Sequence, residues 1–361
     1  MSELDSLPVY QRLDPSGMLQ RLHEFPEQCQ RAWSSSSRLR LPKDYSQISS
    51  VIISGMGGSA IGGEFIHRIT ALENGLPVRV HRDYGLPPLV DRHTLLILSS
   101  YSGNTEETIS CFAESLKTDA KKLVLTTGGK LRELAEKEGF PVLPIDYRAP
   151  PRAAFPYSFV SLLGIFNTLG LIRDKSDDLD EALQVLRSLS ANIDETMPLA
   201  SNPAKQLAAE MHGHMAVVYG AGLLSEVAQR WKTQLNENSK VWAFYEILPE
   251  LNHNAVVGYR FPFEVGAETM VVLLHSSLLH PRVSMRYRFT TEILVKEAIK
   301  HKTIEASGRS ALAQMMELVL LGDYVSFYLA ILNGVDPTQV APIEYLKSQL
   351  AGSQEGLPYN P

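Results

Sequence analysis

Between residues 48 and 146, short apolar runs rich in β-branched residues alternate with longer amphipathic stretches. Short runs of this kind are typical of buried strands, and apolar residues at helical spacing are typical of surface helices. The runs predict strands at residues 50–54, 77–81, 94–99, 122–126 and 141–145, with helices at 106–117 and 130–138. Because strands that alternate with helices form parallel sheets through right-handed crossovers, we expect a doubly wound α/β domain.

A proline-rich segment, residues 147–157, interrupts this alternation and predicts a boundary. Helical patterns follow at residues 159–171 and 177–193. From residue 215 the order of strand, Gly-x-Gly turn and helix returns, so residues 215–240 resemble a degenerate second copy of the stretch that begins at Val51. Further strands are predicted at 269–274 and 302–306, and further helices near 284–300, 310–332 and 342–350.

The pattern therefore predicts two related α/β domains with doubly wound parallel sheets. We expect a first domain over residues 1–155 with a helical lead-in, a helical connector over 156–200, and a second domain over 201–361 that ends in a helix. In such sheets, ligands bind beyond the carboxyl ends of the strands, where the strand-to-helix turns gather.

Composition restricts the partners of the protein. The chain has 361 residues, 44% of them hydrophobic, and a formal net charge of −6 that is spread along its length. This balance argues against nucleic acid or a membrane surface as a partner but allows an anionic small substrate at a local site. Cys29 and Cys111 lack metal or redox spacing, which is typical of a reducing compartment. With a polar N-terminus and no apolar run approaching roughly 20 residues, we expect a cytoplasmic protein.

The glycine-rich stretch SGMGGSAIGG, residues 54–63, directly follows the first predicted strand. It formally matches the dinucleotide fingerprint through Gly55, Gly57 and Ala60, and Asp83 follows the second predicted strand. Alternatively, the turn is simply tight. A third interpretation is a phosphate site, in which main-chain N–H groups of Gly57 and Gly58 at a helix start act with the Ser59 hydroxyl.

A second stretch, SSYSGNTEET from Ser99, favours the phosphate interpretation. It ends the third predicted strand and opens the next helix with Ser100, Ser102 and Thr105. A nicotinamide site has no particular need for three hydroxyls there, and helix capping requires only one. Several neutral donors beside a positive helix end are suited to a phosphate monoester. The turn at residues 125–130 is expected mainly to cap a helix.

Together these two stretches resemble the sugar-isomerase (SIS) domain, which binds sugar phosphates. PPR at 150–152, NENSK at 236–240 and PELNHN at 249–254 are similar to motifs of the bifunctional phosphoglucose/phosphomannose isomerase family. Weaker similarity covers nearly the whole chain. The resemblance implies two flavodoxin-like SIS domains, a homodimer whose active site lies at a domain and subunit junction, and a place in glycolysis and gluconeogenesis.

The resemblance also implies roles for individual residues in aldose–ketose isomerisation, which moves a proton between C1 and C2 through a cis-enediol. Glu237, at the end of an amphipathic run, would be the base, and Arg152, held stiffly behind two prolines, would stabilise the enediolate charge. His253 would open the sugar ring from the partner subunit, with its flanking asparagines holding one tautomer. Lys347 would assist ring opening, and Glu250 is a second candidate acid or an orienting partner of the histidine.

This chemistry requires no cofactor and no metal, and the two histidines at 212 and 214 lack a third ligand at a suitable spacing. Two other functions remain open at this point. A non-catalytic SIS sensor would keep the serine loops but would not need Glu237, Arg152 and His253 together. A nicotinamide dehydrogenase would use the glycine turn as its fingerprint.

Overall fold

A computed structural model describes residues 3–352, which form two compact units. The first-sheet unit comprises Glu27–Lys175 and the C-terminal segment from Val340. The second-sheet unit comprises the N-terminal segment through Pro26 and Ser176–Gln339.

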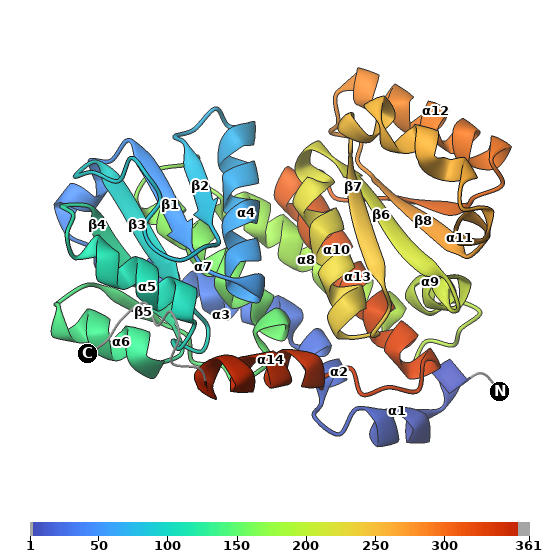
Figure 1. Ribbon diagram of the computed structural model, residues 1–361, viewed down its shortest axis with the longest axis horizontal. Coiled ribbons are helices and arrows are strands. Elements are labelled where there is room, and N and C mark those ends of the chain that lie inside the picture. Colours follow the sequence, from blue (N-terminus) through green and yellow to red (C-terminus); the bar gives the residue numbers. More distant parts are fainter. Residues whose placement is uncertain (1–2, 353–361) are drawn as a thin grey trace. The chain divides into compact units, whose positions relative to one another are not determined.

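The first-sheet unit contains a five-stranded parallel sheet in the order β2-β1-β3-β4-β5 (Figure 1). Its strands are β1 (Ser50–Ser54), β2 (Val78–His81), β3 (Thr94–Ser99), β4 (Lys121–Thr126) and β5 (Val142–Pro144). Every residue of β3 is buried, as expected for a central parallel strand covered on both faces. All five strands were predicted from the apolar runs, with ends that differ by one residue.

Helices cover both faces of this sheet. The helices of this unit are α3 (Phe25–Ser37, which the division cuts after Pro26), α4 (Gly57–Leu72), α5 (Glu106–Ser115), α6 (Gly129–Lys137) and α7 (Phe155–Thr168), with short 3-10 helices η2 (Lys43–Ser46) and η3 (Pro151–Ala154); α14 (Ala341–Gly352) belongs to the unit, but the side chains of residues 341–350 are exposed. Helices α4 and α7 pack closely, because a Cβ at Gly62 of α4 would lie 2.6 Å from the Ser158 carbonyl of α7. This contact attaches the beginning of the expected connector to the first sheet.

The second-sheet unit has four parallel strands in the order β7-β6-β8-β9. They are β6 (Met215–Ala221), β7 (Ala243–Leu248), β8 (Thr269–His275) and β9 (Lys300–Glu305). In both sheets the second strand in the chain lies beside the first, and the third follows on the other side. The two sheets therefore repeat one doubly wound topology, and the predicted α/β fold with an internal repeat is confirmed.

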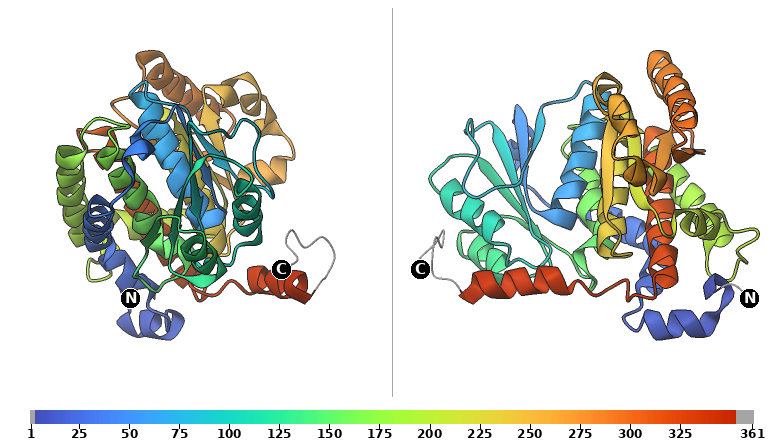
Figure 2. Two further views of the ribbon diagram at one scale, coloured as in Figure 1. Left: turned by 90° about the vertical axis from the view of Figure 1, so that its left-hand side faces the viewer. Right: turned by 45° about the vertical axis from the view of Figure 1, so that its right-hand side comes forward.

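The second-sheet unit contains one long apolar helix, α13 (Ala311–Leu332), among its helices. They are α1 (Leu7–Leu13), α2 (Met18–His23), α8 (Ser176–Ile193), α9 (Pro203–Met211), α10 (Ser225–Glu237), α11 (Phe263–Ala267), α12 (Pro281–Lys296) and α13 (Ala311–Leu332), with 3-10 helices η1 (Glu3–Asp5), η4 (Gly222–Leu224), η5 (Glu250–His253) and η6 (Ala255–Arg260). Helix α13 packs against α8, α9 and α10 (Figure 2). By length and composition α13 could cross a membrane, so the expectation that no apolar run reaches that length was wrong; within this unit almost all of it is buried.

The compact units do not follow the linear division expected from the pattern. The expected connector is shared, because α7 packs on α4 of the first sheet and α8 packs on α13 of the second-sheet unit. The N-terminal helices belong with the second sheet, whereas α14 belongs with the first. Residues 1–2 and 353–361 of the expected domains lie outside the described residues.

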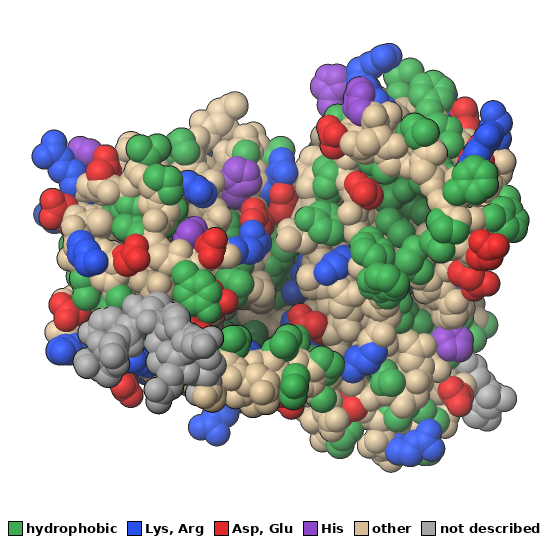
Figure 3. Space-filling model, in the orientation of Figure 1, with side chains coloured by type: hydrophobic (Ala, Val, Ile, Leu, Met, Phe, Trp, Pro, Cys, Tyr) green, Lys and Arg blue, Asp and Glu red, His purple; other side chains and the backbone are tan. Residues whose placement is uncertain are grey.

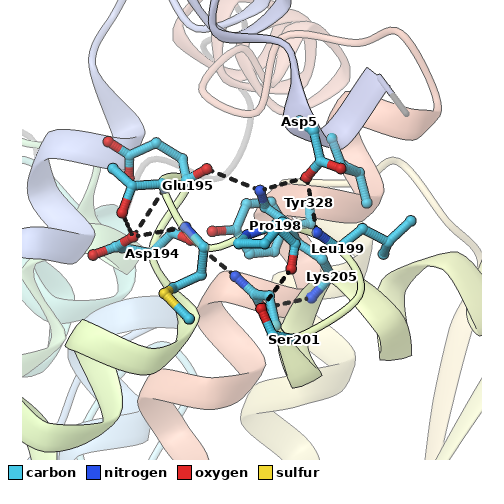
Figure 4. A network of polar contacts seen from close by, with 12 residues as sticks. Asp5, Asp194, Glu195, Pro198, Leu199, Ser201, Lys205 and Tyr328 are labelled. Atoms are coloured by element: carbon cyan, nitrogen blue, oxygen red, sulfur yellow. Dashed lines mark hydrogen bonds and ion pairs between the residues drawn. The ribbon is translucent and has the colours of Figure 1, made fainter. Parts of the chain in front are cut away.

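A buried polar network explains why the N-terminal segment belongs to the second-sheet unit (Figure 4). The Lys205 ammonium is fully buried and contacts Asp5 Oδ1 at 3.1 Å and the Glu195 carbonyl at 2.9 Å. The main-chain N–H of Leu199 also donates to Asp5 Oδ1, and the Lys205 ammonium lies 5.6 Å from the centre of the Tyr328 ring. A buried cation is tolerated only when it is paired in this way, so the network fixes the N-terminus on this unit.

His23 makes a second attachment, which predicts a pH dependence of stability. Its Nε2 lies 2.8 Å from Glu195 Oε2. The hydrogen bond to Glu195 raises the pKa of His23 against the opposing effect of burial, and the nearby Asp194 and Glu24 carboxylates act in the same direction as the bond. The same bond lowers the pKa of Glu195.

The contribution of His23 to the free energy of unfolding is complete below the pKa of the histidine in the unfolded chain, and it is lost as the pH rises through the folded pKa. The contribution of Glu195 to the same free energy is lost as the pH falls through the lowered pKa of this carboxyl group. The pair therefore stabilises the unit most between about pH 4.5 and 6.5. We expect the difference in free energy of unfolding between the natural chain and His23→Gln, measured with urea, to be larger at pH 6 than at pH 8.5. A difference independent of pH would contradict this account.

Candidate active site

The two polar turns identified in the sequence lie at the switch point of the first sheet. The order of strands reverses direction between β1 and β3, which are direct neighbours. The glycine turn follows β1 and the hydroxyl-rich turn follows β3 (Figure 1). Adjacent carboxyl ends at a switch point form the crevice in which doubly wound folds bind ligands.

Three positions of the first turn are glycine for different structural reasons. A Cβ at Gly55 would lie 2.7 Å from the Ser99 carbonyl oxygen, so this glycine allows the two turns to approach. A Cβ at Gly58 would lie 3.0 Å from the Pro151 carbonyl, which brings the PPR segment against the start of α4. Gly57 has φ +48°, yet a Cβ there would meet no described atom within 4 Å. The turn is therefore tight on two sides and open at Gly57.

Neither helix that starts at these turns is capped by a side chain. Met56 is the N-cap residue of α4, and Thr105 is the N-cap residue of α5, and neither makes a side-chain cap hydrogen bond. The Thr105 hydroxyl instead accepts a hydrogen bond from Ser100 Oγ at 2.9 Å. Because uncapped helix starts present N–H groups and partial positive charge, this pair of helix ends is suited to an anion.

The structure brings the predicted hydroxyl residues onto these two turns. Ser59 Oγ accepts from the Tyr101 N–H at 3.0 Å, which ties the first turn to the second. Ser100 Oγ also accepts from the Gly103 N–H at 3.1 Å, and Ser102 Oγ accepts from the Asn104 N–H at 3.2 Å. Ser59 and Ser100 are buried, whereas Ser102 is exposed. The arrangement supplies neutral donors at the sheet edge without a lysine.

The turn after β4 supports the hydroxyl loop, a role that the sequence did not indicate. The Thr127 hydroxyl donates to the Tyr101 carbonyl at 2.7 Å, and the Leu131 N–H donates to the Gly103 carbonyl at 2.9 Å. Asn104 Oδ1 accepts from the Lys130 N–H at 3.1 Å. These hydrogen bonds join residues far apart in the chain, so no local pattern could have revealed them.

The corresponding place in the second-sheet unit is filled. Gly222 has φ +54° and occupies the position of Gly57 in the repeated turn, but a Cβ there would lie 2.9 Å from Leu279 Cδ2. Leu224 takes the place of Ser59. The hydroxyls of Ser276 and Ser277, which follow β8, both contact the buried side chain of Gln314. Of the two repeated turns, the one in the first-sheet unit is the open one.

Arg152 lies on η3, in the same unit as the open turn. Arg152 is buried, with 4% of its surface exposed. The main-chain nitrogen of Arg152 lies 3.2 Å from where a Cβ on Gly58 would stand, so η3 packs directly on the turn. Arg152 is therefore a buried residue rather than a solvent-exposed one.

Glu237 is the last residue of α10 and is partly exposed. The following residues are fixed to α13, because Asn238 Nδ2 donates to Ser326 Oγ at 3.0 Å and Ser239 Oγ donates to the Ser326 carbonyl at 2.6 Å. The Lys240 ammonium donates to the carbonyls of Glu237 and Asn238. The main chain that carries this carboxylate is therefore held firmly.

His253 ends η5 and is exposed, and it makes no hydrogen bond within the described part of the chain. The expectation that its asparagine neighbours hold its tautomer was wrong. Asn252 Nδ2 donates to Thr290 at 2.8 Å, and Asn254 Nδ2 donates to Glu250 Oε1 at 2.8 Å. Glu250 thus orients Asn254 rather than the histidine.

Lys347 lies on α14, where the side chains of residues 341–350 are exposed. Among residues 3–352, it forms no contact with another predicted site residue. Within the same range, no three His, Cys, Asp or Glu side chains gather as they would for a metal ion. The structure thus brings together the open turn and the Arg152 segment in one unit, while Glu237 and His253 belong to the other.

Known proteins share this fold. Residues 200–350 match the family model described as the bacterial phospho-glucose isomerase C-terminal SIS domain. A glucose-6-phosphate isomerase-like protein from Thermus thermophilus superposes with a TM-score of 0.62 at 20% identity, covering 94% of this chain and 99% of that one; this likeness shows the fold.

Closer relatives extend over almost the whole chain. The bifunctional phosphoglucose/phosphomannose isomerase of Caldicellulosiruptor bescii is 40% identical over 92% of this chain and 99% of its own length. The enzyme of that name from Aquifex aeolicus is 36% identical over 86% of this chain and 93% of its own. On this similarity, the chain belongs to the bifunctional phosphoglucose/phosphomannose isomerase family.

Proposed function

We propose that this protein interconverts glucose 6-phosphate and mannose 6-phosphate with fructose 6-phosphate. The family membership carries the reaction type. The substrate class is inferred from the glycine–serine turn at the switch point of the first sheet, which is open. The corresponding turn of the second sheet is filled. Retention of an open anion site in only one repeat is what a single sugar phosphate requires.

In this proposal the main chain of Gly57 and Gly58 and the hydroxyls of four residues hold the 6-phosphate. These residues are Ser59, Ser100, Ser102 and Thr105. Two uncapped helix starts and several neutral donors balance a dianion without burying a further charge. Phosphate binding there leaves C1 and C2 of the sugar free to reach the catalytic groups.

A single hydroxyl deletion tests the phosphate assignment. Thr105→Val is expected to raise KM for fructose 6-phosphate about tenfold or more with kcat retained, since a hydrogen bond to a charged group contributes roughly 1.5–3 kcal/mol. Thr108, one turn further along α5, provides the control, because its buried hydroxyl has no hydrogen-bond partner among the described residues. Thr108→Val should leave KM unchanged, and equal effects of the two variants would remove Thr105 from the phosphate site.

The chemical steps are assigned to four side chains. His253 and Lys347 would open the ring by moving protons at the ring oxygen and the C1 hydroxyl. Glu237 would then carry the proton between C1 and C2, and Arg152 would stabilise the negative charge of the cis-enediol intermediate. Rotation about C2–C3 before reprotonation would let one base produce either epimer at C2.

Isotope incorporation tests this proton-transfer route. A carboxylate that holds the substrate proton exchanges it with solvent, so glucose 6-phosphate formed from fructose 6-phosphate in ²H₂O should carry deuterium at C2. A hydride shift between the two carbons would retain protium. Product without any deuterium, measured by proton NMR at early conversion, would contradict a proton that exchanges with solvent while Glu237 holds it.

The partner in this proposal is a second copy of the chain. Large apolar side chains are exposed on β7, η6 and α11 of the second-sheet unit, including Val257 (81% exposed) and Phe263 (74% exposed), and Trp242 and Phe261 are exposed next to these elements. Hydrophobic side chains gather over this face in Figure 3. The exposed His253 lies on the same segment of chain. An exposed apolar surface of this kind is typical of a protein interface.

Mixing two inactive variants tests whether His253 serves the partner's site. If it does, Glu237→Gln and His253→Gln proteins that exchange subunits form a heterodimer with one complete site, and about a quarter of the sites regain activity. If His253 acts within its own subunit, mixing restores none. A molar mass of one chain by light scattering would also contradict the dimer.

We place this activity in the cytoplasm. Cys29 and Cys111 are both free thiols and both buried, as is usual where disulfides do not form. Of the proposed substrates, glucose 6-phosphate and fructose 6-phosphate are intermediates of glycolysis and gluconeogenesis.

A further inference from the structure

Tyr101 lies between two of the proposed phosphate ligands, Ser100 and Ser102, yet its own contacts face other elements. Its side chain lines a cavity of about 460 Å³ together with Thr127, Gly128, Ile145, Tyr147 and Arg148. The proposed phosphate chemistry gives Tyr101 no role. Its hydrogen bonds indicate one.

The main chain of Tyr101 is fixed to the turns on either side. Its N–H donates to Ser59 Oγ at 3.0 Å, in the turn after β1. Its carbonyl accepts from the N–H of Thr127 at 3.0 Å and from the Thr127 hydroxyl at 2.7 Å, in the turn after β4. Tyr101 therefore moves only if the turns after three neighbouring strands move with it.

The Tyr101 hydroxyl extends this rigid centre to a segment without regular structure. It donates to the Tyr147 carbonyl and accepts from the Ala149 N–H at 2.9 Å. Residues 145–150 form neither helix nor strand, so their main-chain groups need partners outside regular structure. Ile145 and Pro150 have main-chain partners, and the Tyr101 hydroxyl serves Tyr147 and Ala149. One hydroxyl thus satisfies a donor and an acceptor just before η3.

This segment leads directly to Arg152. Besides the Ile145 N–H, which donates to the Thr126 carbonyl at 2.8 Å, its attachments include a stacking contact between the rings of Tyr147 and Tyr157, with centres 5.2 Å apart, and a hydrogen bond from Gln28 to the Tyr147 hydroxyl. The last two hold the side chain of Tyr147, and the Ile145 bond lies at the start of the segment, before the main chain that continues toward η3. Because the cavity adjoins residues 145–149, loss of the Tyr101 hydroxyl would leave this main chain room to shift.

We propose that Tyr101 is a positioning residue: its hydroxyl holds the segment before η3 against the phosphate turns, so that the Arg152 guanidinium stays where the enediolate charge develops. This inference rests on the proposed function. Binding energy from the remote phosphate then also orders the group that acts on the reacting carbons. A guanidinium displaced by even about 1 Å can lose roughly a hundredfold in rate.

Tyr101→Phe tests this role, since it removes one oxygen and keeps the ring. We expect kcat for fructose 6-phosphate to fall roughly ten- to hundredfold. The inhibition constant of glucitol 6-phosphate, which binds through the same phosphate but cannot isomerise, should change less than about threefold. Tyr45→Phe is the matched control, because the Tyr45 hydroxyl donates to the Lys122 carbonyl in the same unit, at 2.8 Å. It should lower the melting temperature and leave kcat unchanged.

Two results would overturn the inference: a Tyr101→Phe protein with kcat within about twofold of the natural chain, or one whose kcat falls only as far as that of Tyr45→Phe. A double-mutant cycle with Arg152→Lys adds a second criterion. If Tyr101 acts through Arg152, the loss in the double variant is smaller than the product of the single losses, whereas independent roles give the full product. The proposed function is tested separately, by whether the natural chain converts fructose 6-phosphate at all.

Discussion

Glu237→Gln is expected to lower kcat for fructose 6-phosphate by roughly a thousandfold, within the range that a positioned general base contributes. The amide has the shape of the carboxylate but cannot accept the substrate proton. Its place should not change, because the residues that follow Glu237 are hydrogen-bonded to Ser326 of α13. Rates of glucose 6-phosphate formation by the purified variant, and its inhibition constant for glucitol 6-phosphate, measure catalysis and binding separately.

Glu250→Gln provides the comparison for this variant. Glu250 is the second acid near the proposed machinery, and its Oε1 accepts from Asn254, a hydrogen bond that a glutamine oxygen retains. We expect a change in kcat below about threefold for this variant. If Glu250→Gln lost as much activity as Glu237→Gln, or if Glu237→Gln kept the natural rate, the base would have to be assigned elsewhere.

Arg152→Met is expected to lower kcat by about 10²–10³-fold, the size of effect seen when one charge-stabilising donor is removed from an active site. Methionine fills much of the buried space, so the loss reflects the missing charge more than a cavity. Arg152→Lys keeps the charge but loses the forked donors, and it should recover only part of the rate.

The cause of this loss can be measured with an inhibitor. A phosphorylated hydroxamate that mimics the enediolate should bind to Arg152→Met more weakly by a factor similar to the loss in kcat. Binding of glucitol 6-phosphate, which lacks the developing charge, should hardly change. A rise in KM alone, with kcat and hydroxamate binding retained, would make Arg152 a ground-state ligand.

The apolar pattern was sufficient for the first sheet but missed part of the second. Strands β1, β3 and β4 are almost entirely buried, so they consist of short apolar runs that are easily recognised. Strand β7 was not predicted, because it lies at the edge of its sheet and has exposed Phe244 and Tyr245 in its middle. Apolar residues run from Val241 to Tyr245, but Glu246 interrupts them, and burial does not alternate regularly along the strand.

The sequence also could not predict which segments pack together. The association of the N-terminal helices with the second sheet depends on the pair Lys205 and Asp5, which are far apart in the chain. Helix α7 starts at Phe155, before Pro156, because proline is accepted in the first turn of a helix; the proline-rich segment therefore contains the beginning of this helix as well as a boundary.

At the candidate site, residue types were predictable and their partners were not. Clustered glycines and hydroxyls after two strands indicated an anion site on chemical grounds. Only the three-dimensional packing shows that the turn is open at Gly57 and that Leu279 fills the corresponding place at Gly222. The Tyr101 hydroxyl, the asparagines beside His253 and the burial of Arg152 all depend on contacts between distant parts of the chain.

The most direct test of the central claim is to supply the purified protein with fructose 6-phosphate in the presence of EDTA. Glucose 6-phosphate is detected with its dehydrogenase, and mannose 6-phosphate by anion-exchange chromatography of a separate quenched sample without the dehydrogenase. We expect both aldose phosphates to form with the metal ions chelated. Absence of turnover, in a protein whose melting temperature still rises with fructose 6-phosphate, would contradict the isomerase and identify a sugar-phosphate sensor.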